Sequence, residues 1–548
     1  MIDKNKRNPR RIRSAFVKCA SLAILLLIAV AIGADLENIS RLFQQLIPTP
    51  PPSEIVVHSH SGLSDAIRTA NQTETEVTTI RFGGDISLGG TLPKITSEIF
   101  IKGDSFSIDG SSRFRIFDVS NGKLTIEDLT IVDGMATDGG AIFNFEGDLT
   151  ISGCTFRNNS TDESGGVIYN RAGNIGIANS HFESNIATQN GGAIANFEGE
   201  VNVNASTFRT NSAGGGGAIY NYEGTLVLDT VELDGNSAEV GGAVFAGKKF
   251  TADGITIIKT ATIRDNAAHS GGAIVVYGGK MEISDNTHIY NNSADDAAGA
   301  IGIAEGHVTI SDSNIRDNSA DTGGVAAILQ ASGTLIISKS QLNNNSADNG
   351  GVIHSANGGT VTIDDSNVNG NSAKEFGSVI FSKAATVSIS NSTFSENTAQ
   401  GSTIASGGGM LSIQNSSFID NAGGRGGGAI GIAMEALLTV ENSEFTGNSA
   451  DGGGAIMASE NSRLRITKGE FSNNSADYGG AIYSLEGSVT IKSSIFSDNS
   501  AGLAGGAIWN SDGSLIVKDT KFTDNSSKRE KDIWNSGGSF TNSNNSFE

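Results

Sequence analysis

Two short motifs recur along this chain at a nearly constant spacing. The first is Gly-Gly-Ala-Ile, which stands at residues 479–482 and returns at residues 505–508. The second is an apolar residue followed three positions later by asparagine, as at Phe156 and Asn159. A fixed period of about 26 residues is typical of one supersecondary unit that is stacked many times. The repeat therefore indicates a solenoid, which grows by adding units to one continuous core.

One repeat, taken as an example, shows what the unit is. Residues 193–196, 201–203 and 206–208 are short segments of strand-forming residues with turns between them. Gly191 and Gly192 predict a tight bend, because the absence of Cβ permits a positive φ. Three short strands and three turns make one coil of a β-helix. The chain is therefore predicted to be an all-β protein, a single-stranded right-handed parallel β-helix of about 16 coils.

Equivalent positions of successive coils should stack into columns with a spacing of about 4.8 Å. The isoleucine of the first motif and the apolar residue of the second are predicted to point inward. The asparagines should form a ladder, because asparagine tolerates left-handed backbone and its amide bonds to the next amide in the stack. This column consists of Asn159, Asn185, Asn211, Asn236, Asn266, Asn292, Asn318, Asn345, Asn371, Asn397, Asn421, Asn448, Asn474, Asn499 and Asn525.

Composition supports this fold and excludes some partners. No proline follows Pro93, and proline is excluded from sheet interiors because it lacks the backbone donor. The formal net charge of −22 makes nucleic acid and anionic lipid unsuitable partners. Of the two cysteines, Cys19 lies in the N-terminal segment and Cys154 is expected to be a small buried core residue.

The N-terminal part differs from the repeats. Residues 1–34 have a basic block followed by an apolar run, which predicts a signal peptide or a signal anchor. Residues 35–53 form a Pro-rich linker. Residues 54–138 are predicted to form a cap and irregular entry coils, including a short helix capped by Ser61 that covers the open end of the solenoid. Residues 139–548 then form the repeat β-helix.

The two motifs, repeated together over residues 139–535, carry a family resemblance. The chain resembles the polymorphic outer membrane proteins of chlamydiae and related right-handed parallel β-helix proteins of pectin-lyase-like fold. The resemblance implies a protein that is surface-exposed or secreted, and in several cases an adhesin. Chlamydial members end in a membrane β-barrel, whereas this sequence stops at Glu548, soon after its last repeat.

The pectin-lyase-like fold also occurs in polysaccharide lyases and glycoside hydrolases, so catalysis was considered. The acidic and basic groupings that these enzymes use do not occur in the sequence, and the repeats stay regular throughout. The nearest pair of carboxylates is Glu198 and Glu223, which occupy the same turn of adjacent coils, with Glu146 in the same column. At about 5 Å this separation would suit a retaining glycosidase. Three exposed turn acids are the simpler interpretation, and no catalytic residue is predicted.

Two binding features are candidates. Asp451 and Asp477 occupy equivalent places in neighbouring coils, where they would share Ca²⁺, although solvated turn residues are the simpler interpretation. The position after the inward isoleucine points outward, and in the last three coils it is Tyr483, Trp509 and Trp534. A row of exposed aromatic rings is able to stack on sugars or to fill a pocket of a partner protein. The alternative is a purely structural role, in which the rings stack on one another and stabilise the sheet.

These observations predict an exported β-helix that acts in adhesion or binding without catalysis, either secreted or at the outer surface of the cell envelope. The predicted partner is a carbohydrate or a surface protein. No cofactor is expected, and a membrane would be contacted only through an uncleaved N-terminal segment. The alternatives are a polysaccharide lyase or glycoside hydrolase of the same fold, and a structural spacer. The oligomeric state stays open.

Overall fold

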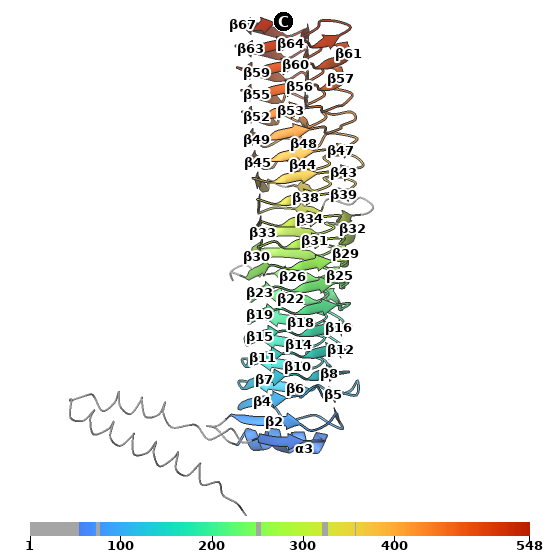
Figure 1. Ribbon diagram of the computed structural model, residues 1–548, viewed down its shortest axis with the longest axis vertical. Coiled ribbons are helices and arrows are strands. Elements are labelled where there is room, and N and C mark those ends of the chain that lie inside the picture. Colours follow the sequence, from blue (N-terminus) through green and yellow to red (C-terminus); the bar gives the residue numbers. More distant parts are fainter. Residues whose placement is uncertain (1–53, 73–76, 248–253, 321–326, 357) are drawn as a thin grey trace, which may run out of the picture. The chain divides into compact units, whose positions relative to one another are not determined.

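The coils of residues 54–548 follow one another in a single stack, with the last coil at the far end from the helix (Figure 1). The predicted signal segment (1–34) and linker (35–53) lie outside the residues described. In the computed structural model, the described residues are 54–72, 77–247, 254–320, 327–356 and 358–548. In those stretches, no helix is both long enough and apolar enough to cross a membrane.

Each coil contributes strands to parallel sheets that run along the stack. In one coil, β18 (Ile194–Phe197) and β19 (Glu200–Asn204) lie in the first sheet, β20 (Thr207–Arg209) in the second and β21 (Ser212–Gly215) in the third. The prediction of three strands per coil is too low for such coils. The fourth strand forms because the chain after the asparagine pairs in parallel with the next coil, as Ser212 does with Ser237.

Pairing stays in register between most neighbouring coils, with register shifts in three strand pairs. Ile456 lies opposite Ile482, which lies opposite Ile508. The chain is therefore a right-handed parallel β-helix, as predicted, with about 18 turns. The prediction of about 16 coils is slightly low, because entry segments that lack the motifs also join the stack. One of them, β7 (Lys123–Glu127), pairs along its whole length with β11 (Asp148–Ser152).

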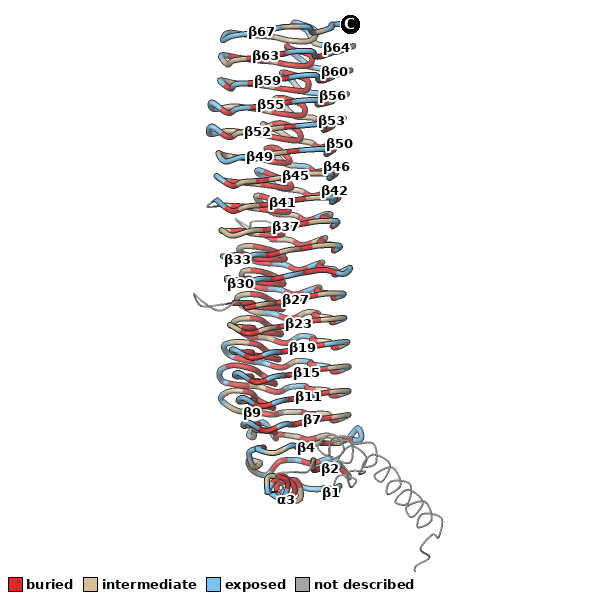
Figure 2. Tube along the Cα trace, turned by 90° about the vertical axis from the view of Figure 1, so that its left-hand side faces the viewer, coloured by how far each residue is buried: buried red, intermediate tan, exposed pale blue. Residues whose placement is uncertain are grey.

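Apolar columns fill the interior, and buried residues recur from turn to turn of the stack, except in its last coil (Figure 2). The ring of Phe445 lies 4.9 Å from that of Phe418 and 4.8 Å from that of Phe471, with interplanar angles of 4° and 3°. All three side chains are fully buried. The predicted phenylalanine column is thus a continuous stack of parallel rings in this part of the core.

The asparagine ladder is present and fully buried. Each side-chain amide donates to the side-chain oxygen of the next asparagine at 2.9–3.1 Å. Asn371, for example, also donates to Leu342 O at 2.8 Å and accepts from Asn345 N at 2.9 Å. At the C-terminal end, Asn525 donates instead to the carboxylate of Asp532 at 2.9 Å. The ladder therefore satisfies buried backbone groups as well as its own amides.

The glycine pair of the first motif has two separate physical reasons. Gly479 has a φ of 58°, a left-handed conformation that glycine adopts without strain. Gly480 is required because there is no space for a side chain: a Cβ there would lie 2.1 Å from the carbonyl oxygen of Gly506 in the next coil. The first glycine thus serves the turn, and the second allows the coils to approach.

A short helix closes the N-terminal end of the stack. Helix α3 (His60–Ala70) packs against β1 (Glu54–Val57) and β2 (Thr78–Phe82), and it buries Leu63 and Ile67 completely. The sequence predicted this helix, but its N-cap is Ser59 rather than Ser61. The Ser59 hydroxyl accepts from Gly62 N at 3.2 Å, because the helix begins one residue after it.

Candidate functional site

One outward-facing column runs along the C-terminal half of the first sheet. Its members follow the buried isoleucine of each coil, on β40 (Ile353–Ser355), β44 (Ile380–Lys383), β48 (Ile404–Gly407), β51 (Ile430–Ala433), β54 (Ile456–Ala458), β58 (Ile482–Leu485), β62 (Ile508–Ser511) and β66 (Ile533–Ser536). Because these strands pair in register, the side chains lie one above another. In chain order this outward column is His354, Phe381, Ala405, Gly431, Met457, Tyr483, Trp509 and Trp534.

The three aromatic residues singled out from the sequence lie together in this column. The rings of Tyr483 and Trp509 are stacked, with centroids 4.4 Å apart and an interplanar angle of 11°. Trp534 lies opposite Trp509 in the register of the sheet. Tyr478, which the sequence analysis did not select, joins from β57 (Ser475–Tyr478), 5.5 Å from Trp509. We call these four residues the aromatic strip.

The aromatic strip is only partly covered. Tyr483, Trp509 and Trp534 are half-buried, whereas Tyr478 is 38% exposed. Burial raises the pKa of Tyr483, and the neighbouring Tyr478 adds to the effect. Its phenol therefore stays neutral at physiological pH and is able to donate a hydrogen bond. The strip therefore presents partly exposed aromatic rings to the outside of the stack.

The two candidate calcium ligands lie beside the strip. Asp477, directly before Tyr478, is one coil from Asp451, and Asp477 N donates to Asp451 O at 3.1 Å. Both residues are exposed. In the described part of the chain, no three His, Cys, Asp or Glu side chains come together in a way that could hold a metal ion. Calcium binding by this pair stays a prediction from the sequence.

Acidic residues also follow the strip on the far side of the strands. Glu460, Glu486 and Asp512 occupy the turns after β54, β58 and β62, with φ values of 53°, 58° and 57°. All three are exposed, and none forms an ion pair with a described residue. Carboxylates therefore border the aromatic strip on both sides along the strands.

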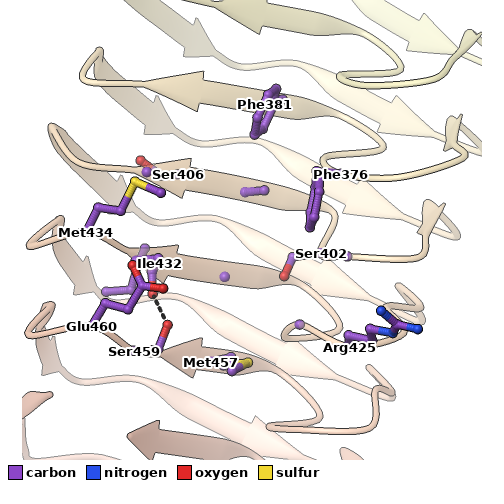
Figure 3. Close-up of a pocket in the computed structure, with 16 residues that line it drawn as sticks. Phe376, Phe381, Ser402, Ser406, Arg425, Ile432, Met434, Met457, Ser459 and Glu460 are labelled. Carbon is purple, nitrogen blue, oxygen red and sulfur yellow. Dashed lines mark hydrogen bonds between the residues drawn. The ribbon is translucent and has the colours of Figure 1, made fainter. Parts of the chain in front are cut away.

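The column is interrupted by small residues, and the gap is a pocket. Ala405 and Gly431 lie between Phe381 and Met457, and the space above them forms an apolar pocket of about 370 Å³ (Figure 3). Phe376 contributes from the loop before β44. Sequence reasoning missed this site. The available signal was two consecutive small residues in a column that is otherwise large.

His354 precedes Phe381 in the column by one coil and itself lies opposite Leu329 of the coil before. Its ring meets that of Phe381 edge to face at 4.9 Å, and its Nδ1 is buried without a hydrogen-bond partner. Burial lowers the pKa of His354 to about 4, and the nearby positive charge of Lys383 acts in the same direction. The folded chain therefore holds this imidazole neutral at physiological pH.

This lowered pKa predicts a loss of stability in acid. The unfolded chain protonates His354 below about pH 6.5, whereas the folded chain resists protonation down to about pH 4. The free energy of unfolding should therefore fall as the pH drops through that window. We expect His354→Phe to remove on the order of 2 kcal/mol of this acid-induced loss. Denaturant unfolding of both proteins at neutral and acid pH measures it, and equal losses would contradict it.

A second aromatic row occupies the same outward position in the N-terminal coils. Phe143 stacks on Tyr169 at 5.3 Å, and Tyr220 stacks on Phe245 at 4.8 Å. Between them the column has Ala195, and Phe197, two residues later on the same strand, bridges the gap at 5.2 Å from Tyr169. Phe197 could not be selected from the column position alone. Burial raises the pKa of Tyr220 to about 12.

The three acids considered for glycosidase chemistry lie in turns, and the simpler interpretation of exposed acids fits Glu146 and Glu198, whereas Glu223 is half-buried. Glu146, Glu198 and Glu223 follow β10 (Ile142–Phe145), β18 and β22 (Ile219–Tyr222) at φ values of 53°, 60° and 59°. Glu198 and Glu223 belong to adjacent coils, since Glu198 N donates to Tyr222 O at 3.0 Å. Glu146 and Glu198 are exposed. In backbone position they resemble the acids that follow the C-terminal strands.

Comparisons with known proteins agree with the fold. A family model described as a right-handed beta helix region matches residues 249–418 and 378–547, which together make up more than half of the chain. A model of the Chlamydia polymorphic membrane protein repeat matches residues 153–171. Among curated proteins, none matches this chain.

Solved structures with a similar course of the chain include an enzyme and an adhesin. A PL6 family alginate lyase, AlyGC, is 11% identical over 90% of this chain and 100% of its own, with a TM-score of 0.28. PfbA, a surface adhesin of Streptococcus pneumoniae, is 11% identical over 80% of this chain and 92% of its own, with a TM-score of 0.32. Likeness at this level does not bear on function. The family match and the stacked coils together show that the chain belongs to the family of right-handed β-helix proteins.

Proposed function

We propose that this chain is an exported, non-catalytic binding and adhesion protein of the cell surface, and that it binds carbohydrate through the aromatic strip. One observation carries the proposal: Tyr483 and Trp509 present stacked rings on the outward face, with Tyr478 beside them and Trp534 next in register. The C–H faces of sugar rings are apolar and pack on aromatic rings. A row of rings on consecutive coils suits a ligand that is itself a row of similar units.

The acids beside the strip suit the same ligand. Sugar hydroxyls are hydrogen-bond donors, and ionised carboxylates accept strongly from them. Asp451 and Asp477 lie on one side of the rings, and Glu486 and Asp512 follow the strands on the other. No lysine or arginine pairs with these carboxylates in the described structure, and Asp512 accepts one hydrogen bond, from Ser511 Oγ at 2.8 Å, so acceptor sites are left for a ligand.

A location outside the cell is supported by three features. Residues 1–34 have the layout of a secretory signal. The match at residues 153–171 is to a repeat of chlamydial membrane proteins. The formal charge of −22 favours solubility and discourages association of like chains. We propose that the chain contacts a membrane only through its N-terminal segment, where that segment is retained.

Removing the indoles tests the proposal. We expect the double variant Trp509→Ala and Trp534→Ala to bind glycan about tenfold more weakly, since two ring contacts are lost, while its unfolding midpoint changes little. A polysaccharide array screened for binding and for cleavage identifies the ligand, and calorimetry measures the affinity.

The matched control is Ile516→Ala, an exposed apolar residue of the same coil as Trp509 on β63 (Ser514–Lys518), which should bind like the wild type. Unchanged affinity of the double variant would reject the strip as the site. Cleavage of any polysaccharide on the array would favour the alternative of an enzyme. Absence of any ligand on the array would favour a structural spacer.

A further inference from the structure

The pocket above Ala405 and Gly431 differs chemically from the aromatic strip. Its walls are Phe376, Phe381, Met434 and Met457. Phe376 is 49% exposed and Met434 is 67% exposed, so two large apolar side chains at its edge face solvent. Leaving such groups uncovered is unfavourable unless a partner covers them, and methionine adapts its shape to varied partners. Figure 3 shows these side chains around the vacant stretch of the column.

Two serine hydroxyls of the pocket, those of Ser402 and Ser406, already take part in hydrogen bonds within the fold. Ser402 Oγ accepts from Gly427 N at 2.9 Å. Ser406 Oγ donates to Gly408 O at 3.1 Å and accepts from Ser382 Oγ at 3.0 Å. A sugar placed here would find charged partners only at the two ends, at Arg425 and Glu460, while the hydroxyls over the apolar centre would lose their hydrogen bonds to water, which is costly. The pocket therefore favours an apolar occupant over a carbohydrate.

Two charged side chains stand at opposite ends of this apolar surface. Arg425 lies near Ser402 at one end, and Glu460 lies near Met434 at the other (Figure 3). Among the described residues neither takes part in a salt bridge, and both are exposed. A chain segment that crosses the pocket along the strands would meet an apolar centre with a positive group at one end and a negative group at the other.

We propose that this pocket binds a segment of a partner protein, by taking up one large apolar side chain that is flanked by a basic residue toward Glu460 and an acidic residue toward Arg425. The volume of about 370 Å³ is within the range of small ligand sites and has room for one such side chain. Burial of the anchor supplies the affinity, and the two charges fix the direction of the segment. This site is separate from the strip proposed to bind glycan.

The pocket can be filled without touching the core. In the variant Ala405→Phe, the outward column gains the ring that Phe381 provides one coil earlier, so the fold should tolerate it and the unfolding midpoint should stay or rise. The probe is a library of short random peptides displayed on phage and selected on the intact wild-type chain. Selected peptides are then synthesised, and their affinities are measured by fluorescence anisotropy.

We expect the selected peptides to share an apolar residue between a basic and an acidic one. Ala405→Phe should weaken their binding about tenfold or more, because the new ring fills the pocket and the apolar side chain of the peptide can no longer enter it. Should this variant fold poorly, Met434→Gln at the exposed rim provides an independent test. Glu460→Gln should weaken the peptide severalfold, and should have no effect once the basic residue of the peptide is replaced by serine.

The control for charge is Glu198→Gln, the same turn position in a distant coil, which should bind the peptide like the wild type. The variant Trp509→Ala with Trp534→Ala should also retain the peptide, so failure of the glycan site and failure of this site are distinguishable. The proposal is overturned if no selected peptide distinguishes the wild type from Ala405→Phe, or if the shared feature of the peptides is not an apolar anchor.

Discussion

Asn371→Ala should lower the free energy of unfolding by about 4 kcal/mol, far more than a typical surface substitution. The side chain of Asn371 donates to Asn397 Oδ1 at 2.9 Å and to Leu342 O at 2.8 Å, and it accepts from the backbone and amide of Asn345. Alanine leaves a buried backbone donor and a buried carbonyl without this partner. Each such group costs about 1–3 kcal/mol.

The measurement is guanidinium unfolding combined with amide hydrogen exchange. Because each coil contacts mainly its neighbours, the exchange of Asn345, Asn371 and Asn397 should accelerate before that of distant coils. The control Asn367→Ala removes an exposed asparagine of the same coil and should change stability by less than about 0.5 kcal/mol. Similar effects of the two substitutions would show that the ladder is not a source of stability.

Phe445→Ala is the second change with a large expected effect, a loss of about 4 kcal/mol. The ring is fully buried between Phe418 and Phe471, so its removal leaves a cavity that the neighbouring coils cannot close without losing their own register. Phe445→Leu should cost less, since Leu342 fills the same column elsewhere in the stack.

Denaturant unfolding of both variants tests this series, with Phe540→Ala as the control at a position that is 40% exposed. The control should lose less than about 1 kcal/mol. If Phe445→Ala and Phe540→Ala lost equal stability, the stacked rings would contribute no more than exposed ones. A loss for leucine as large as that for alanine would show that ring stacking, rather than volume, holds this column.

The columns could be predicted because residues that lie one repeat apart in the sequence lie next to each other in the stack. Ile482 contacts Ile508 through the repeat, so a position's neighbours are read one period away. The same rule placed Tyr483, Trp509 and Trp534 together, and it found the asparagine ladder. The entry coils, such as that of β7, were expected over residues 54–138 but lack the motifs, so a count based on the motifs gave too few coils.

Features that depend on what is missing from a column were harder to foresee. The pocket exists because Ala405 and Gly431 are small, and a motif search that looks for chemically reactive residues passes over them. Phe197 reaches the N-terminal row from a position two residues along the strand, where Ala195 leaves room. Both cases are local departures from a column. They depend on which side chain fills the space, and spacing alone does not specify that.

The asparagine ladder also has a direction. Every hydrogen bond from one asparagine side chain to the next runs toward the C-terminal end, while the second N–H of an amide such as that of Asn371 donates to a carbonyl of the preceding coil, so the asparagine-to-asparagine bonds line up head to tail along the stack. The column therefore has a partial negative pole at Asn159, whose oxygen accepts from Gly134 N, and a partial positive pole at Asn525. The carboxylate of Asp532 accepts a hydrogen bond from Asn525 at that positive pole. An acidic side chain thus compensates the partial charge at the C-terminal end of the asparagine ladder, which lies in an otherwise apolar core.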